Sequence, residues 1–460
     1  MRLRSTIVLV AGAIMGYQLF CDPIVGLANN GDFVRVLAAY RLVPDCEAGH
    51  DCYFKYVTTR YRFEPNLGFG LDQFTSELIT MVPALAMNWF LSKDGYFDLR
   101  VIGFIHAALW LSGLWWLMPL FERWTKWRRR IMGALLLLVF TDFVYVQYSN
   151  TFYKDAETVI YSFLMFVFLL RLAAGLGKPF LNGAGLAVTL AMALMAKAQH
   201  MLLFLPVLGF LFLFRRRYWP HSPRSLYAFL TLMLVALVAL AVTVPRAQKV
   251  VSFYNIVFSG ILPDAPDRNE ALKELGLPAW YSQFSGSHAY SENAAMNAYA
   301  EDLEKRASQR TLIGYYFRHP GAALALLLRG LPDAGRQRVP GYGNFPKESG
   351  LPERMPTRAF AVWSNVKETI FQDRPGAVVS YFVLSGLALV TGTIRRWGNR
   401  ADLPALAFLG WGMAAMAYAI STLADVLDTT RHLYVYTFLT DVIFLAAAGV
   451  WLHQQRVLKD

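Results

Sequence analysis

The sequence alternates between long apolar segments and short polar segments rich in arginine. Apolar runs of about 18 to 22 residues match the hydrocarbon thickness of a bilayer, which one α-helix crosses in roughly 20 residues. We therefore expect an all-α polytopic membrane protein whose first apolar run is a retained span and not a cleaved signal peptide. The pattern predicts ten transmembrane helices, at 5–21, 99–120, 131–149, 158–175, 183–198, 201–214, 225–245, 377–394, 403–422 and 433–452.

Two apolar regions depart from this simple pattern. The predicted spans 183–198 and 201–214 are short and are separated by Lys197-Ala198-Gln199-His200. They are either tilted spans or a broken hairpin whose tip lies in a cavity. Segment 76–91 is apolar but contains Pro83. Counting it as a span would move every later loop to the opposite side of the membrane. We therefore interpret it as an interfacial helix on the outer membrane surface.

Composition and charge support this topology. The chain is 56% hydrophobic with a mean hydropathy of +0.35, which excludes an ordinary soluble enzyme. With both termini cytoplasmic, the clusters 128–130, 215–217 and 395–396 all face the cytoplasm, as basic loops do. The formal net charge of +12 is then mostly a topology signal, and we expect no nucleic-acid partner. The predicted location is a bacterial plasma (inner) membrane with the active site facing the periplasm or outside.

This topology predicts three regions. Residues 1–245 form a transmembrane module with a large first outer loop at 22–98. Residues 246–376 are too long for a mere connector and are expected to fold as a smaller outer domain. Residues 377–460 supply the C-terminal transmembrane helices.

Two of the three cysteines lie close together in the first outer loop. Cys46 and Cys52 would face an oxidising compartment, where a disulfide forms readily. With His50 between them they also resemble a zinc site, but only three ligands are present and the spacing is not typical of zinc. We therefore favour the disulfide.

Charged and amide side chains gather where the outer loops meet the spans. An ionisable group at this depth is costly unless it binds something. Asp155 and Glu157 have a simpler interpretation as helix caps, and Arg431 with His432 as an interfacial anchor. The candidate catalytic residues are Asp32, Asp155 and Glu157, and the candidate substrate-binding residues are Asn29, Asn30, Lys197, His200, Asp428, Arg431 and His432.

These residue types match the needs of sugar transfer from a lipid phosphate. A carboxylate such as Asp32 would accept the proton of an attacking hydroxyl group, and cations such as Arg431 would neutralise the departing phosphate. We expect a polyprenyl-phosphate-type sugar donor in the lipid bilayer and a cell-envelope glycan or lipid as acceptor. The alternatives are a transporter or flippase of lipid-linked saccharides, and a glycan polymerase or ligase.

Three short motifs carry a resemblance to a known family. They are Ala28-Asn29-Asn30-Gly31-Asp32-Phe33, Tyr254-Asn255-Ile256-Val257-Phe258-Ser259-Gly260-Ile261-Leu262 and Glu274-Leu275-Gly276-Leu277-Pro278. The motifs resemble those of the bacterial glycan biosynthesis hexose transferase family, and the layout of the chain resembles the GT-C superfamily of membrane glycosyltransferases. The resemblance implies hexosyltransferase activity, with Asp32 as the first-loop base and Asp155 and Glu157 as second-loop acids. The first-loop motif has no paired acids, so the resemblance leaves open whether a divalent metal is a cofactor.

Overall fold

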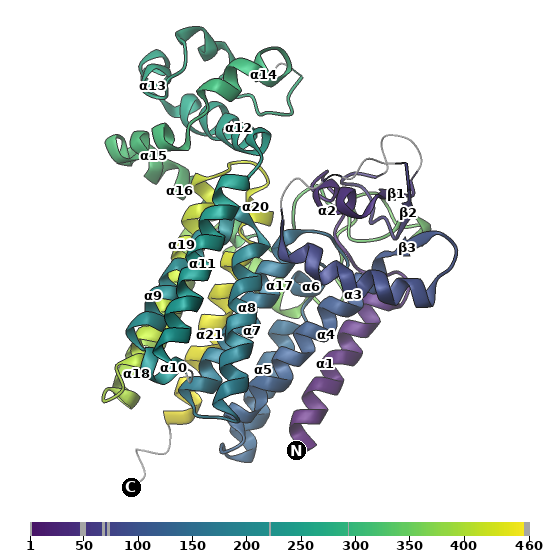
Figure 1. Cartoon of the computed structure of the whole chain (residues 1–460), viewed down its shortest axis with the longest axis vertical. Helices are drawn as coiled ribbons and strands as arrows, with labels where there is room; N and C mark the ends of the chain where they lie inside the picture. Colours follow the sequence, from purple (N-terminus) through teal and green to yellow (C-terminus); the bar gives the residue numbers. More distant parts are fainter. Residues whose placement is uncertain are drawn as a thin grey trace.

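The fold is a bundle of long helices with a small helical head at one end (Figure 1). This computed structural model describes residues 2–46, 52–66, 70, 74–219, 222–292 and 294–454. Helix α1 begins, and the last helix ends, at the end of the bundle opposite the head, as an even number of crossings requires. We call the end that carries the head the upper end, as it is drawn in Figure 1.

Within the described ranges, eight helices are long and apolar enough to cross a membrane. They confirm the all-α polytopic membrane fold, and each coincides with one of the ten predicted spans. These helices are α1 (Arg2–Phe20), α4 (Leu99–Leu117), α7 (Lys154–Ala173), α8 (Pro179–Ala196), α11 (Pro223–Thr243), α18 (Pro375–Trp397), α19 (Asp402–Leu423) and α21 (Tyr434–Gln454).

The other two predicted spans, 131–149 and 201–214, are not single helices. The first ends early because Asp142 starts a new helix, its carboxylate accepting a hydrogen bond from the Val144 amide at 3.2 Å. The second follows a break at Lys197, whose extended backbone (φ −143°, ψ 124°) ends α8. The region of the first span contains α5 (Lys126–Phe140) and α6 (Phe143–Val146), and that of the second contains the 3-10 helix η3 (Ala198–Phe204) and α9 (Leu205–Leu213). Two short helices, η2 (Met118–Phe121) and α10 (Arg215–Tyr218), extend neighbouring helices.

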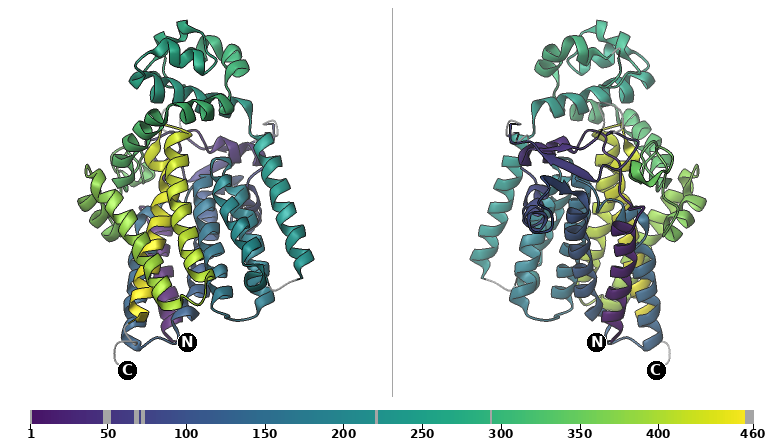
Figure 2. Two further views of the ribbon diagram at one scale, coloured as in Figure 1. Left: turned by 90° about the vertical axis from the view of Figure 1, so that its left-hand side faces the viewer. Right: turned by 90° about the vertical axis from the view of Figure 1, so that its right-hand side faces the viewer.

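Helix α3 (Ser76–Leu91) lies roughly crosswise to the bundle and packs on α4, α7 and α8 (Figures 1 and 2). One side is buried, including Met81 and Ala84. The other side carries Trp89 and Phe90, which are 70% and 75% exposed. An exposed aromatic side on a crosswise helix suits contact with the membrane interface, as the sequence led us to expect.

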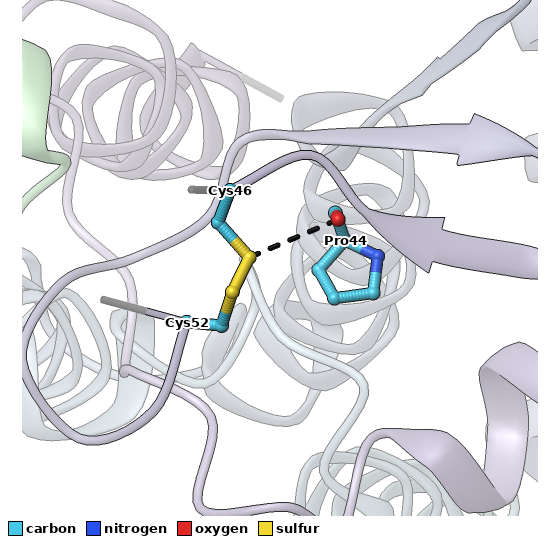
Figure 3. The surroundings of a disulfide bond; sticks show 3 residues. All are labelled: Pro44, Cys46 and Cys52. Carbon is cyan, nitrogen blue, oxygen red and sulfur yellow. Dashed lines mark hydrogen bonds between the residues drawn. A yellow bond between two sulfur atoms is a disulfide. The ribbon is translucent and has the colours of Figure 1, made fainter. Parts of the chain in front are cut away.

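The first loop contains a small antiparallel sheet at the upper end. Its strands are β1 (Leu42–Pro44), β2 (Arg60–Phe63) and β3 (Tyr96–Asp98), in that spatial order, and they follow α2 (Val34–Leu37) and η1 (Ala38–Tyr40). Cys46 and Cys52 form a disulfide beside Pro44, at the end of β1 (Figure 3). His50, the third ligand of the alternative zinc site, lies outside the described residues.

The head has an apolar core of its own, which includes Phe253, Phe258 and Leu272. It stands above the bundle in both views of Figure 2. Its elements are α12 (Arg246–Tyr254), the π-helix η4 (Asn255–Ile261), η5 (Leu262–Asp264), α13 (Arg268–Glu274), η6 (Ala279–Phe284), α14 (Ala295–Arg306) and α15 (Gln309–Arg318). The chain then returns to the bundle through α16 (Pro320–Gly335), η7 (Lys347–Ser349) and α17 (Val362–Phe371).

Segment 336–361 connects α16 to α17 and crosses to the first loop. The Gly343 amide donates to the Phe54 carbonyl at 2.8 Å, and the Gly26 amide donates to the Asn344 carbonyl at 3.0 Å. A side chain at Gly343 would collide with the backbone carbonyl of Lys55, which explains the glycine. The interval 246–376 is therefore divided between the head and a segment that packs on the first loop.

Candidate active site around Arg431

Arg431 lies at the centre of a group of charged side chains at the upper end of the bundle. It belongs to the short helix α20 (Thr429–His432) and is buried. Its guanidinium contacts three carboxylates: Nη2 lies 2.8 Å from Asp32 Oδ2, Nε lies 2.5 Å from Asp428 Oδ2, and Nη1 lies 3.4 Å from Asp155 Oδ2. One cation thus joins the first loop, the start of α7 and the last loop.

Lys197 is the second cation of this group. The break between α8 and η3 places its ammonium 2.8 Å from Asp155 Oδ1 and 3.1 Å from His432 Nδ1. Burial, together with the positive charges of Lys197 and Arg431, lowers the pKa of His432 well below its ordinary value. His432 is therefore neutral at physiological pH and accepts a hydrogen bond from Lys197. We call Asp32, Asp155, Lys197, Asp428, Arg431 and His432 the Arg431 cluster.

Asp32 is held by a turn that its neighbours form. The Asn30 side-chain oxygen accepts from the Asp32 amide at 3.0 Å, and Gly31 has a positive φ of 106°. Arg35 Nη2 lies 3.2 Å from Asp32 Oδ1, and the Asp32 side chain is 26% exposed. Among the three carboxylates of the Arg431 cluster, that of Asp32 is the most exposed to solvent.

The charges around Asp32 set its protonation state. Burial alone would raise the pKa of Asp32, but the positive charges of Arg431, Arg35 and Lys197 outweigh it and lower the pKa to about 2. Asp32 is therefore ionised at physiological pH. While it remains bound to Arg431 it is a weak base.

Two tyrosines that the sequence analysis did not identify complete the site. The Arg431 guanidinium lies 4.7 Å from the centre of the Tyr153 ring, and the Tyr153 hydroxyl accepts from the Asn30 amide at 3.0 Å. The Tyr342 hydroxyl donates to Asp428 Oδ2 at 2.6 Å. Tyr153 lies two residues before Asp155, and Tyr342 lies in the glycine-containing part of segment 336–361. In the sequence, only these positions indicate that the two tyrosines belong to the site.

Comparison with known proteins gives the chain a family. Residues 2–460 match the family described as the YfdI N-terminal transmembrane domain. The chain belongs to this family. The crystal structure of the Archaeoglobus fulgidus oligosaccharyltransferase in the apo form aligns with 99% of the chain at 12% identity and a TM-score of 0.41. The alignment covers 51% of that protein, so the chain spans about half of its length. No curated protein matches the sequence.

In this member of the YfdI family, four of the predicted site residues are not members of the Arg431 cluster. Asn30 is one of them but contacts the cluster, because its Nδ2 donates to Asp428 Oδ2 at 3.3 Å. Glu157 points away because side chains two positions apart on a helix are separated by about 200°. It contacts His106, with 2.9 Å between Oε1 and Nε2. Asn29 shapes the turn by accepting from the Gly31 amide. His200 is buried, and neither of its ring nitrogens has a hydrogen-bond partner among the described residues.

The sequence motif Tyr254–Leu262 contacts the loop that leads into α20, the helix of Arg431. It forms the end of α12 and the π-helix η4, a helix type that occurs frequently at functional sites. Asn255 Nδ2 lies 3.4 Å from Asp425 Oδ1, and the Asn255 side-chain oxygen accepts from the Ala289 amide at 2.9 Å. The head is therefore joined to the loop that leads into α20.

The Arg431 cluster does not fit a divalent metal. Each of its three carboxylates already contacts the Arg431 guanidinium, which occupies the position between them. Within the described part of the chain, a different group has ligand atoms close enough for a metal: Glu77, His106 and Glu157.

The YfdI-family bundle also contains a cavity of about 520 Å³ in its lower half. The cavity lies between α4, α5, α7, α18, α19 and α21, and apolar side chains such as Phe140, Phe163 and Ile443 form most of its wall. None of the predicted site residues lines it. Its lining suits a lipid chain better than a saccharide.

Proposed function

We propose that the chain is an integral membrane glycosyltransferase that moves a sugar from a polyprenyl-phosphate-type donor to a cell-envelope glycan or lipid, on the outer face of the membrane. The observation that carries the proposal is the 2.8 Å contact between Arg431 and Asp32. It brings a buried guanidinium, the best side chain for a phosphate, next to a partly exposed carboxylate that can accept a hydroxyl proton.

The resting cluster suggests how binding and chemistry are coupled. Arg431 and Lys197 contact carboxylates in the structure, so a donor phosphate would have to compete with Asp32 and Asp155 for them. The donor phosphodiester competes because its two free oxygens accept paired hydrogen bonds from a guanidinium, and its single negative charge grows to two as the sugar leaves. Once Arg431 turns to the phosphate, Asp32 loses its strongest positive neighbour. Its pKa then rises from about 2, which makes it a stronger base when the donor is bound.

The transfer step then follows from these positions. Asp32 accepts the proton of the acceptor hydroxyl as that oxygen forms a bond to the anomeric carbon of the sugar. The bond between the anomeric carbon and the phosphate oxygen breaks, and Arg431 and Lys197 stabilise the negative charge on the leaving phosphate. One base suffices for a direct, inverting displacement. Asp155 would keep Lys197 in place throughout.

A reconstituted transfer assay tests this proposal. The purified chain in liposomes is given a polyprenyl-phosphate hexose and an extract of envelope glycans and lipids. We expect a sugar-bearing product and free polyprenyl phosphate in equal amounts. Mass spectrometry of lipid-linked glycans from a deletion strain should show the loss of one hexose. Movement of the intact lipid-linked saccharide across the bilayer, with no new glycosidic bond, would instead establish a flippase.

The proposed orientation has its own test, which uses single-cysteine variants. Ser285 follows η6 in the head, and Ser222 is the N-cap of α11, which follows the short helix α10 at the lower end of the bundle. With Cys21 replaced by serine, Ser285→Cys should react with an impermeant maleimide on intact cells, and Ser222→Cys should react only after permeabilisation. The reverse labelling would put the Arg431 cluster on the cytoplasmic face and contradict an outer-face enzyme.

A further inference from the structure

Glu77, His106 and Glu157 form a second buried cluster, on the side of α7 that faces away from Arg431. Glu77 lies in the first turn of α3, His106 lies in α4, and Glu157 lies in the first turn of α7. All three are completely buried. Two acids and an imidazole in an apolar interior need a compensating charge or proton.

The contacts of the two His106 ring nitrogens show at which atoms the compensating charge or proton is missing. His106 Nδ1 lies 2.8 Å from the carbonyl oxygen of Ser149, which can only accept, so Nδ1 carries a hydrogen. In a neutral ring Nε2 then has a lone pair, and it faces Glu157 Oε1 at 2.9 Å. An unprotonated nitrogen and a carboxylate oxygen repel each other at this distance. Either a proton shared between the two atoms or a metal ion that accepts both lone pairs would remove the repulsion.

Glu77 gives independent evidence for a ligand in this cluster. Both of its carboxylate oxygens are buried, no donor among the described residues lies within hydrogen-bond distance of them, and the side chain that they face is the carboxyl group of Glu157. Nearly all buried polar side chains in folded proteins have a partner. Glu77 Oε2 lies 3.9 Å from His106 Nε2, so the unpartnered carboxylate faces the same point as the imidazole lone pair.

We propose that Glu77, His106 and Glu157 bind a divalent transition-metal ion, Zn²⁺ or Mn²⁺. The three ligand atoms lie within 4.8 Å of one another. Bonds of about 2 Å to a tetrahedral ion separate its ligands by about 3.3 Å, and the two separations from His106 Nε2, 2.9 Å and 3.9 Å, fall on either side of this value. One imidazole with two carboxylates suits Zn²⁺ or Mn²⁺ better than Ca²⁺ or Mg²⁺. Two positive charges would also balance the two carboxylates.

The surroundings have the features of a supported metal site. The Ser149 carbonyl orients the imidazole through Nδ1, as outer hydrogen bonds do for metal-binding histidines. Thr80 Oγ1 lies 3.1 Å from Glu157 Oε2 and 3.1 Å from the Tyr161 hydroxyl, which fixes the second carboxylate.

A metal here would fasten the crosswise helix α3 to α4 and α7. Asp155 lies two residues before Glu157 in the first turn of α7 and contacts both Lys197 and Arg431. The metal would therefore act as a positioning element for the Arg431 cluster without touching substrate. The inference does not depend on the proposed sugar transfer, because metal binding can be measured in its absence.

Metal content of the purified full-length chain tests the inference. The protein is treated with EDTA, loaded with Zn²⁺ or Mn²⁺ alone, passed through a desalting column and analysed by mass spectrometry. We expect about one ion per wild-type chain with at least one of the two metals. Glu77→Gln and His106→Gln should retain at least about tenfold less at matched free metal. The control is His319→Gln, which removes an imidazole 2.9 Å from Glu274 in the head and should retain the wild-type amount.

A measurement on the wild-type chain covers the case in which the variants fail to fold. X-ray absorption of the loaded protein should show one imidazole nitrogen, carboxylate oxygens and no sulfur ligand. A wild-type chain that retains neither metal would overturn the inference and leave a shared proton to compensate the cluster. Sulfur ligation, or an unchanged metal content in folded Glu77→Gln and His106→Gln, would overturn it as well.

Discussion

Arg431→Ala is expected to lower the rate of sugar transfer by about 100- to 1,000-fold, the cost of removing one preorganised charge donor from a reaction centre. The substitution removes the group that would hold the leaving phosphate. It also leaves Asp32, Asp155 and Asp428 facing one another. Arg431→Lys should lose less, because it keeps the charge but lacks the fork that matches a phosphate. Initial rates at varied donor concentration, with purified protein, measure both variants.

Controls separate this effect from a loss of folding. Arg306 pairs with Asp302 in an exposed position on α14 of the head, so Arg306→Ala removes an ion pair outside the Arg431 cluster and should keep wild-type rates. Thermal unfolding in detergent shows whether Arg431→Ala is folded. If the folded variant keeps the donor affinity and the turnover of the wild type, Arg431 has only a structural role as the ion-pair partner of the three acids, and Lys197 with His200 becomes the next candidate for the phosphate site.

Asp32→Asn should keep the fold and lower transfer by at least about 100-fold, as the loss of a general base does. The side chain is 26% exposed, and an asparagine oxygen can still accept from Arg431, so the structural cost is small. Asp45→Asn is the matched control because Asp45 is an exposed aspartate in the same loop. A folded Asp32→Asn variant with near-normal turnover would remove Asp32 from the reaction.

The pH dependence of the wild-type transfer rate should also report the role of Asp32 as the base. In the free enzyme the pKa of Asp32 is about 2, so the protonation of this group should leave kcat/KM unchanged above about pH 4. With the donor bound to Arg431 the pKa is higher, and its acid limb should appear in kcat at a higher pH. The direction in which stability changes with pH follows from the lowered pKa of Asp32. Asp32 stabilises the folded state above its ordinary value of 3.8, and this contribution is lost as pH falls toward 2.

The membrane fold could be predicted because the length of each span and the charge of each loop are properties of a short stretch of sequence. The turn at Asn29-Asn30-Gly31 could be predicted for the same reason, since its hydrogen bonds join residues two to four positions apart. The contact between Asp32 and Arg431 joins residues 399 positions apart and depends on how the helices pack. The sequence pattern assigns these two residues to separate tasks and carries no signal for their direct pairing.

Helical geometry alone predicts that Glu157 and Asp155 do not belong to the same site. Both lie in the first turn of α7, and the angle between neighbours at this spacing places them on different faces. The partners of Glu157 could not be found in this way. His106 looks like a single histidine in an apolar span, and Glu77 like an acid at the start of a surface helix. Only the crossing of α3 over α4 and α7 brings them together.

The long separation between Asp32 and Arg431 has a consequence for biosynthesis. A ribosome delivers the first loop and α7 to the membrane well before α20, so Asp32 and Asp155 are inserted before Arg431. Until the last loop arrives, Arg35 can pair with Asp32, and Lys197 can pair with Asp155. The Arg431 cluster can therefore close only after the last loop has reached the membrane. The order of insertion keeps this candidate site incomplete in a nascent chain.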